Sequence, residues 1–169
     1  MRRLCLLTVA SALATWAVGV ASADSGPGPG NGSPPYPFVV GAGTALTDFG
    51  EQHATVSAHL GPNGPSGHYS FRFGTDERAE GQVECMIVEG NRAVAGGPLR
   101  EPVILNGILV QYGGVSVEDN GEGGLVPDRV YGHYLLAGTF ARLCDPTAVI
   151  APTILLFPVE TGNFVVNSG

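Results

Sequence analysis

Hydrophobic and polar residues alternate with a period of two along much of the chain after residue 38, which predicts strands rather than helices. In residues 53–60 (HATVSAHL) apolar residues take the even positions, and His, Thr and Ser take the odd ones. Residues 68–73 (HYSFRF) alternate in the same way. The segment between them, residues 61–67 (GPNGPSG), consists of turn formers. The two runs therefore predict a β-hairpin with a Gly- and Pro-rich loop.

More strands follow towards the C-terminus. The pattern predicts them over residues 81–90, 91–97, 106–121, 128–140 and 153–166. In the first of these, Val83, Cys85 and Ile87 are expected on one face. Gly90 and Asn91 suit a tight hairpin turn. We expect a bulge or bend at Gly113–Gly114, and an edge strand or bulge at Pro158.

No segment after residue 23 has the apolar spacing of a helix, and no internal repeat is evident. About eight to ten short strands separated by Gly-rich turns predict an all-β fold. The expected architecture is a single antiparallel β-barrel or β-sandwich, and the pattern leaves both open.

The N-terminus has the features of a secretory signal peptide. Arg2 and Arg3 precede an apolar run over residues 4–20, and residues 21–23 (ASA) are small. The apolar run is slightly shorter than the roughly 20 residues that span a bilayer. We therefore expect residues 1–23 to be cleaved before Asp24 and the protein to be secreted. An uncleaved anchor is the alternative.

Three segments are expected in the full chain. After the signal peptide, residues 24–37 are rich in Gly and Pro, and we expect a disordered or extended linker there. Residues 38–169 are expected to form a single all-β domain. No second apolar segment is long enough to span a membrane after signal cleavage.

The charge excludes some partners. The formal net charge is −7, and the chain contains no lysine. Removal of the signal peptide would leave six arginines against 15 acidic residues, a net charge of −9. Such a chain is unsuited to binding nucleic acid or anionic lipid, because both need clustered positive charge.

Two cysteines remain after signal cleavage, Cys85 and Cys144. An even number in an exported chain predicts a disulfide. Two buried free thiols are the alternative. A structural zinc site is not expected from this pair, since such a site uses four ligands at short spacing.

Histidines form the first candidate site. His53 and His59 share one face of a predicted strand, and His68 lies across the predicted hairpin. Three imidazoles on one face would suit zinc or copper, or acid–base catalysis. The alternative is that they lie on the solvated face of a half-buried sheet.

The loop at residues 117–129 (VEDNGEGGLVPDR) is the second candidate. Asp119, Asn120, Glu122 and Asp128 would offer oxygen ligands for calcium, the one cofactor considered. The sequence is not an EF-hand loop, however, and Asp-Asn-Gly is also common in turns. A plain connection between strands is therefore the alternative.

No residue can be assigned a catalytic role, because the chain has neither the G-x-S-x-G nor the H-E-x-x-H motif. A closed barrel of about eight strands could instead hold one small molecule. Six aromatic residues are candidates to line that cavity: Tyr69, Phe71, Phe73, Tyr112, Tyr131 and Tyr134. The alternative is that these rings fill the core.

Several segments together resemble a family of small, uncharacterised exported proteins of high-GC Gram-positive bacteria. They are SAHLGPNGPSGHYSFRF, GQVECMIVEGNRAVAGG, VEDNGEGGLVPDR, LCDP and FPVETGNFVVNSG. The resemblance runs from about residue 41 to the C-terminus, and it implies an exported, all-β protein in which Cys85 and Cys144 match the family cysteines. Met86 and Pro98 depart from the family pattern. The resemblance implies no activity.

The leading interpretation is a secreted, non-enzymatic binding or cell-envelope-associated module with an unknown extracellular ligand or protein partner. One alternative is a metal- or His-dependent extracellular enzyme that uses the face with His53, His59 and His68. Another is a purely structural surface protein.

Overall fold

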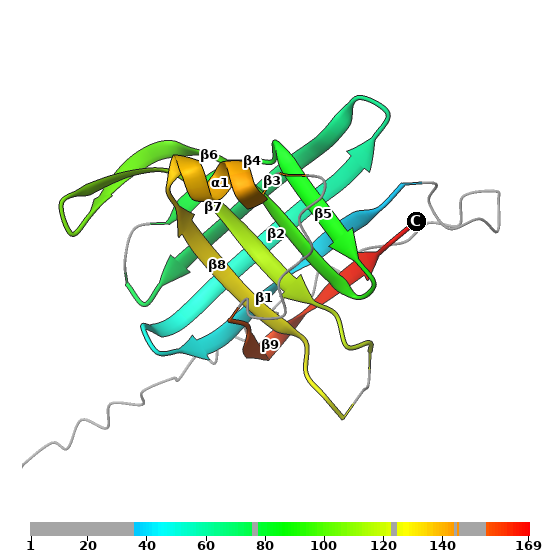
Figure 1. Cartoon of the computed structure of the whole chain (residues 1–169). Coiled ribbons are helices and arrows are strands. Elements are labelled where there is room, and N and C mark those ends of the chain that lie inside the picture. Colours follow the sequence, from blue (N-terminus) through cyan, green and yellow to red (C-terminus); the bar gives the residue numbers. More distant parts are fainter. Residues whose placement is uncertain (1–35, 76–77, 123–124, 144, 146–154) are drawn as a thin grey trace, which may run out of the picture. The chain divides into compact units, whose positions relative to one another are not determined.

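The computed structural model describes residues 36–75, 78–122, 125–143, 145 and 155–169. Within these residues the chain forms nine strands and one short helix (Figure 1). In chain order they are β1 (Phe38–Thr47), β2 (Gly50–Gly61), β3 (Gly64–Phe73), β4 (Ala79–Gln82), β5 (Cys85–Glu89), β6 (Arg92–Leu105), β7 (Ile108–Glu118), β8 (Arg129–Leu135), α1 (Ala137–Leu143) and β9 (Phe157–Asn167). The fold is all-β, as the alternating pattern predicts.

The sheet closes on itself. Every pair is antiparallel, and the order runs β4-β3-β2-β1-β9-β8-β7-β6-β5. A further antiparallel pairing, between Gly81 of β4 and Leu99 of β6, links the first strand of this order to the strand beside its last one and so makes a ring. Glu84 N–H also donates to Gly96 C=O at 2.9 Å. The sequence leaves open whether the fold is a barrel or a sandwich, and the ring of paired strands corresponds to a barrel.

Side chains from the inner face of the strands fill the barrel. Tyr69, Phe71 and Phe164 are the largest apolar side chains there, each 1% exposed. Small residues on β2, such as Ala54 and Ala58, leave room for these rings. The predicted alternation over residues 53–60 is confirmed, because the even positions 54, 56 and 58 are buried.

The predicted loop at residues 61–67 is shorter in the structure. Only Pro62 and Asn63 form the turn, and β2 and β3 pair on either side of it. Gly67 stays within β3 at a φ of +133°, where a Cβ would lie 2.0 Å from the carbonyl oxygen of Ser57. Gly67, which the sequence pattern assigns to a loop, is therefore required in β3, because β2 lies too close there for any side chain.

The predicted strand at residues 81–90 divides into β4 and β5. Val83 and Met86 both lie in the core, so the inward-facing position shifts by one residue between them. The prediction that Val83 and Cys85 share a face is wrong for this reason. A local irregularity of this kind bends the strand, and it lets β4 and β5 both follow β6.

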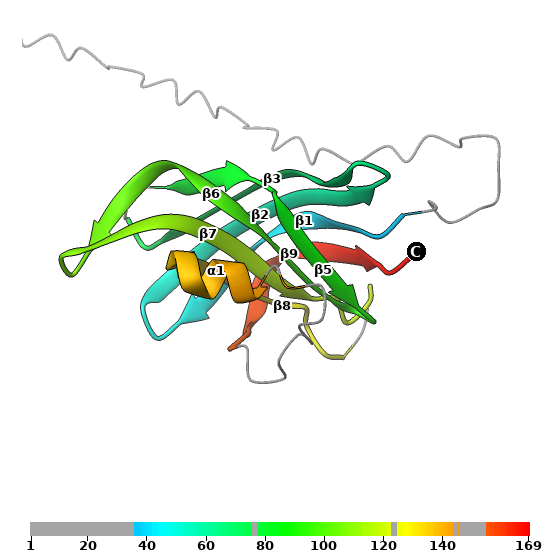
Figure 2. The same ribbon diagram turned by 45° about the horizontal axis from the view of Figure 1, so that its top comes forward.

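The expectation of no helix is also wrong, because Ala137–Leu143 form α1. This helix is too short to give a repeating apolar pattern. Its Phe140 ring stacks on Tyr112 of β7, with centroids 4.5 Å apart, so α1 lies on the outside of the barrel (Figure 2). No helix in the described part of the chain is long and apolar enough to cross a membrane.

Candidate functional site

The three candidate histidines point outward and do not meet. His53 Nδ1 lies 3.0 Å from Thr44 Oγ1, and its Nε2 lies 2.8 Å from a Glu51 carboxylate oxygen. His59 Nε2 is 3.0 Å from Ser66 Oγ. Six residues of extended strand separate the two histidines, a span of about 20 Å.

His68 pairs in register with Ser57 and lies between the other two histidines along the sheet. In the described part of the chain, no three His, Cys, Asp or Glu side chains are placed to hold one metal ion. The arrangement supplies no support for a zinc, copper or catalytic site at His53, His59 and His68. That site stays a prediction.

The carboxylates of the Asp119–Asp128 loop bind backbone groups. Asp128 accepts from the N–H groups of Asn120 at 2.8 Å and Phe164 at 2.9 Å, one on each oxygen. Asp119 accepts from Gly121 at 2.8 Å and Val166 at 2.9 Å in the same way. Each carboxylate therefore ties the loop to β9.

The other two candidate ligands are Asn120, which also bonds to the backbone of the loop, and Glu122, which is exposed to solvent. Asn120 Nδ2 donates to the carbonyl of Pro127 at 2.8 Å. These contacts are the ordinary turn chemistry named as the alternative. The calcium site at Asp119, Asn120, Glu122 and Asp128 stays a prediction without structural support.

Several other predictions fall on residues outside the description. Cys85 lies buried at the start of β5, but Cys144 is not among the described residues. The disulfide therefore stays a prediction. The signal peptide, residues 1–23, and nearly all of the linker, residues 24–37, also lie outside the described residues.

A pocket of about 470 Å³ opens at one end of the barrel. We call it the aromatic pocket, and it is lined by Phe49, Phe73, Leu105, Tyr131, Gly132, His133 and Tyr134. Phe49 comes from the β1–β2 turn and Leu105 from the tip of the β6–β7 hairpin, and these two turns project from the same end of the barrel (Figure 1). β3 and β8 supply the floor.

The rings of the aromatic pocket pack mainly edge to face. Phe73 lies at the centre, with ring centroids 6.1 Å from Phe49, 5.9 Å from Tyr131 and 6.4 Å from Tyr134. Below it, Phe71 meets Tyr134 at 4.9 Å. Such contacts favour fixed orientations of the rings. Because Phe71 belongs to the core, the floor of the pocket is continuous with the core.

The backbone beneath the pocket is held by a buried amide. Gly132 N–H donates to Gln52 Oε1 at 3.0 Å, and Gln52 Nε2 donates to the Gly132 carbonyl at 3.4 Å. Gly132 is required here, because a Cβ would lie 2.4 Å from the Phe71 ring. This contact joins β2 to β8 and holds the part of β8 that carries Tyr131 and Tyr134.

Two ionisable groups of the pocket are neutral at pH 7, and their surroundings shift both pKa values further in favour of the neutral form. Burial, aided by the nearby negative charge of Asp48, raises the pKa of Tyr131. Burial lowers the pKa of His133 to about 4, and its Nε2 lies 2.7 Å from Ser116 Oγ. At neutral pH the pocket thus has uncharged aromatic walls that carry a few polar atoms.

Half of the aromatic residues proposed to line a cavity do so. Phe73, Tyr131 and Tyr134 line the aromatic pocket. Tyr69 and Phe71 lie in the core instead, and Tyr112 stacks on α1. The cavity itself opens at the barrel end rather than along the interior.

Sequence reasoning missed Phe49 and Leu105. A usable signal exists for Leu105, because Asn106-Gly107 between apolar residues is a strong two-residue hairpin sequence. Both turn residues have positive φ, 50° and 79°. Phe49 carries no comparable signal, since one aromatic residue beside a turn glycine is common.

No family model matches this chain, and neither the curated proteins nor the solved structures searched contain a significant match. The resemblance to uncharacterised exported proteins therefore stays a prediction.

Proposed function

We propose that this protein is an exported, non-enzymatic binding module that holds a small, largely apolar ring compound in the aromatic pocket. The observation that carries the proposal is the pocket itself, with its volume of about 470 Å³ and its aromatic walls. Ligand sites of this kind are typically clefts of roughly 300–1,000 Å³ lined by apolar side chains with a few polar groups.

The exposure of apolar side chains around the pocket supports this reading. Phe49 is 70% exposed, although it makes an aromatic contact with Phe73. On the adjoining hairpin, Ile104, Ile108 and Leu109 are exposed as well. A cluster of exposed apolar residues at one end of an acidic protein marks a surface that gains free energy when it is covered.

The polar atoms of the pocket suit orientation of a ligand rather than catalysis. The Tyr131 hydroxyl is protonated at neutral pH, as for any tyrosine, and its pKa is raised further, so it can donate a hydrogen bond. His133 is neutral at pH 7 and already bonded to Ser116. Ser116 is only 2% exposed and does not line the pocket, so the hydroxyl that His133 contacts is not presented to a bound molecule.

Titration with N-phenyl-1-naphthylamine, a neutral fluorescent ring compound, tests the proposal. We expect saturable binding to the secreted protein and a loss of at least about tenfold in affinity for Phe49→Ala and for Leu105→Ser. The matched controls are Leu125→Ala and Leu125→Ser, because Leu125 is fully exposed in the loop at the other end of β7. Weak, unsaturable fluorescence, or equal loss in the controls, would count against the site.

A further inference from the structure

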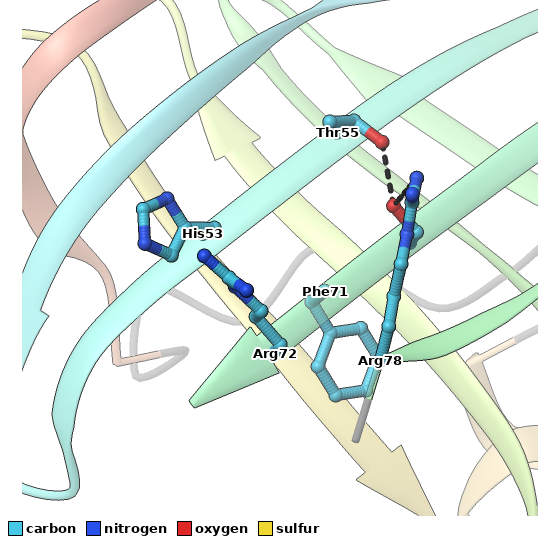
Figure 3. A pocket seen from close by; sticks show the side chains of 6 residues that line it. His53, Thr55, Phe71, Arg72 and Arg78 are labelled. Carbon is cyan, nitrogen blue, oxygen red and sulfur yellow. Dashed lines mark hydrogen bonds between the residues drawn. The ribbon is translucent and has the colours of Figure 1, made fainter. Parts of the chain in front are cut away.

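A second, polar hollow lies on the outer face of β2 and β3 (Figure 3), and it shares no lining residue with the aromatic pocket. We call it the arginine groove, and it is lined by His53, Thr55, Ser70, Phe71, Arg72 and Arg78. Its volume is about 310 Å³. The strand register builds it, because His53 pairs with Arg72 and Thr55 pairs with Ser70. Four polar side chains therefore lie together on one outward-facing patch.

Hydrogen bonds orient one side of the arginine groove. Arg78 Nη2 donates to Ser70 Oγ at 2.7 Å, and Ser70 Oγ lies 2.7 Å from Thr55 Oγ1. Ser70 is only 3% exposed, so this hydroxyl is a fixed support rather than a mobile surface group. One of the five N–H donors of Arg78 is used in this bond, and its Nε lies 3.7 Å from a Glu80 carboxylate oxygen.

Arg72 enters the groove from the other side. Figure 3 shows its side chain directed towards His53, with Arg78 standing on the far side of Phe71. No carboxylate among the described residues forms an ion pair with Arg72. The two guanidinium groups thus flank one hollow, and one of them is without a described anionic partner.

The local charge differs from that of the whole molecule. Glu51 is engaged by His53, and Glu80 is shared by Arg78 and by Arg100 at 2.9 Å. Three arginines thus gather on one side of a chain whose net charge is −7. Asp76 and Glu77 precede Arg78 in the sequence and lie outside the described residues. Within the arginine groove itself no carboxylate is among the lining residues, and two guanidinium groups beside the hydroxyls of Thr55 and Ser70 favour an oxyanion.

The arginine groove continues into a neighbouring hollow of about 500 Å³ that shares Ser70 and Arg78. The neighbouring hollow is lined in addition by His68, Glu80, Gln82 and Glu84. Carboxylate and amide oxygens there accept hydrogen bonds from hydroxyl groups. An extended ligand that bears one acidic group and several hydroxyls would match both parts.

We propose that the arginine groove binds the carboxylate of an acidic saccharide, with Arg72 and Arg78 contacting the carboxylate and the adjoining hollow contacting sugar hydroxyls. The site is separate from the aromatic pocket, so each stands or fails alone. Guanidinium groups bind carboxylates by paired, charge-assisted hydrogen bonds, and these are stronger than bonds between neutral groups.

Calorimetric titration of the secreted protein with glucuronate, glucose and inorganic sulfate tests this proposal. We expect glucuronate to bind saturably and to exceed glucose in affinity by at least about tenfold. Arg72→Gln should weaken glucuronate binding by at least about tenfold, whereas Arg142→Gln on α1 should change it by less than about twofold. Both variants remove one positive charge, so the comparison separates a local contact from a change in net charge.

Arg72→Gln is the decisive variant, because the Arg72 side chain has no ion pair with a described carboxylate and the change leaves the backbone pairing of β3 in place. An unchanged melting temperature would show that the fold is intact. Arg78→Gln provides a second variant on the other side of the groove. Sulfate binding as tight as glucuronate binding would overturn the saccharide assignment and leave an inorganic oxyanion site. Absence of saturable binding by any of the three, or an equal loss in Arg142→Gln, would overturn the site altogether.

Discussion

The side-chain amide of Gln52 bonds to the backbone of β8 at Gly132, where β8 no longer pairs with β9. Among the described residues β9 pairs with β8 only at Arg129 and Val130. Gln52 is fully buried, and its side chain both accepts from and donates to the Gly132 backbone. A polar residue at an inward position is thus a structural requirement of the barrel end that holds the aromatic pocket.

Replacement of this amide by an apolar side chain should be costly. Gln52→Leu leaves the N–H and carbonyl of Gly132 buried without partners, so we expect the free energy of unfolding to fall by about 2–4 kcal/mol. Urea denaturation measures it. Gln82→Leu is the control, since Gln82 is exposed on β4, and its effect should stay within about 0.5 kcal/mol. Equal stability of Gln52→Leu and the wild type would contradict this role.

His133 should make the stability depend on pH. Its pKa in the folded protein is about 4, below the ordinary value of 6.5. Protonation therefore favours the unfolded chain, and the stabilisation that is complete above about pH 6.5 is lost as the pH falls towards 4. The loss amounts to at most about 3 kcal/mol.

The comparison with His133→Gln isolates this contribution, because the acidic residues titrate in both proteins. The free energy of unfolding of the wild type, measured by denaturation between pH 7 and 4, should fall more steeply than that of the variant. Parallel curves would show that His133 is not responsible.

At the scale of elements, the loop before β8 acts as a clamp on β9. Asp119 and Asp128 each bind one loop N–H and one β9 N–H. The sequence shows an acidic Gly-rich loop but not the direction of its carboxylates, which depends on β9 lying beside it. Turn chemistry could therefore be proposed from the sequence, whereas the clamp could not.

The clamp predicts a specific loss of stability. Asp128→Asn replaces one accepting oxygen by a donor that faces another donor, so we expect the free energy of unfolding to fall by about 1–3 kcal/mol. Glu122→Gln is the matched control, because it removes the same charge from an exposed position. A melting temperature that rises in calcium and falls in chelator would instead support an ion in this loop.

At the scale of the whole molecule, the sequence predicts the fold class well and the details of closure poorly. Alternation over residues 53–60 and 68–73 is a direct consequence of one buried face. The shift of inward position between Val83 and Met86 and the pairing of Gly81 with Leu99 depend on contacts far apart in the chain. For the same reason the aromatic pocket, which joins two turns and two distant strands, is only half visible in the sequence.

The export that we expect from the sequence leads to a prediction for the full chain. The denatured mass of the secreted protein should correspond to a chain that begins at Asp24 and is lighter by two hydrogens through a bond between Cys85 and Cys144. Reduction should then lower the stability by roughly 4 kcal/mol, the entropic effect of opening a loop of that length. A mass that retains residues 1–23, or both thiols, would contradict the corresponding prediction.

The most direct test of the central claim, that the aromatic pocket holds an apolar ligand, is native mass spectrometry after incubation with extract of the host's culture. The binding account predicts an excess mass of about a few hundred daltons, the size that such a pocket encloses. The excess should disappear on denaturation and be absent from Phe49→Ala but present in Leu125→Ala. A native mass equal to that of the bare chain, or an excess retained in Phe49→Ala, would contradict it.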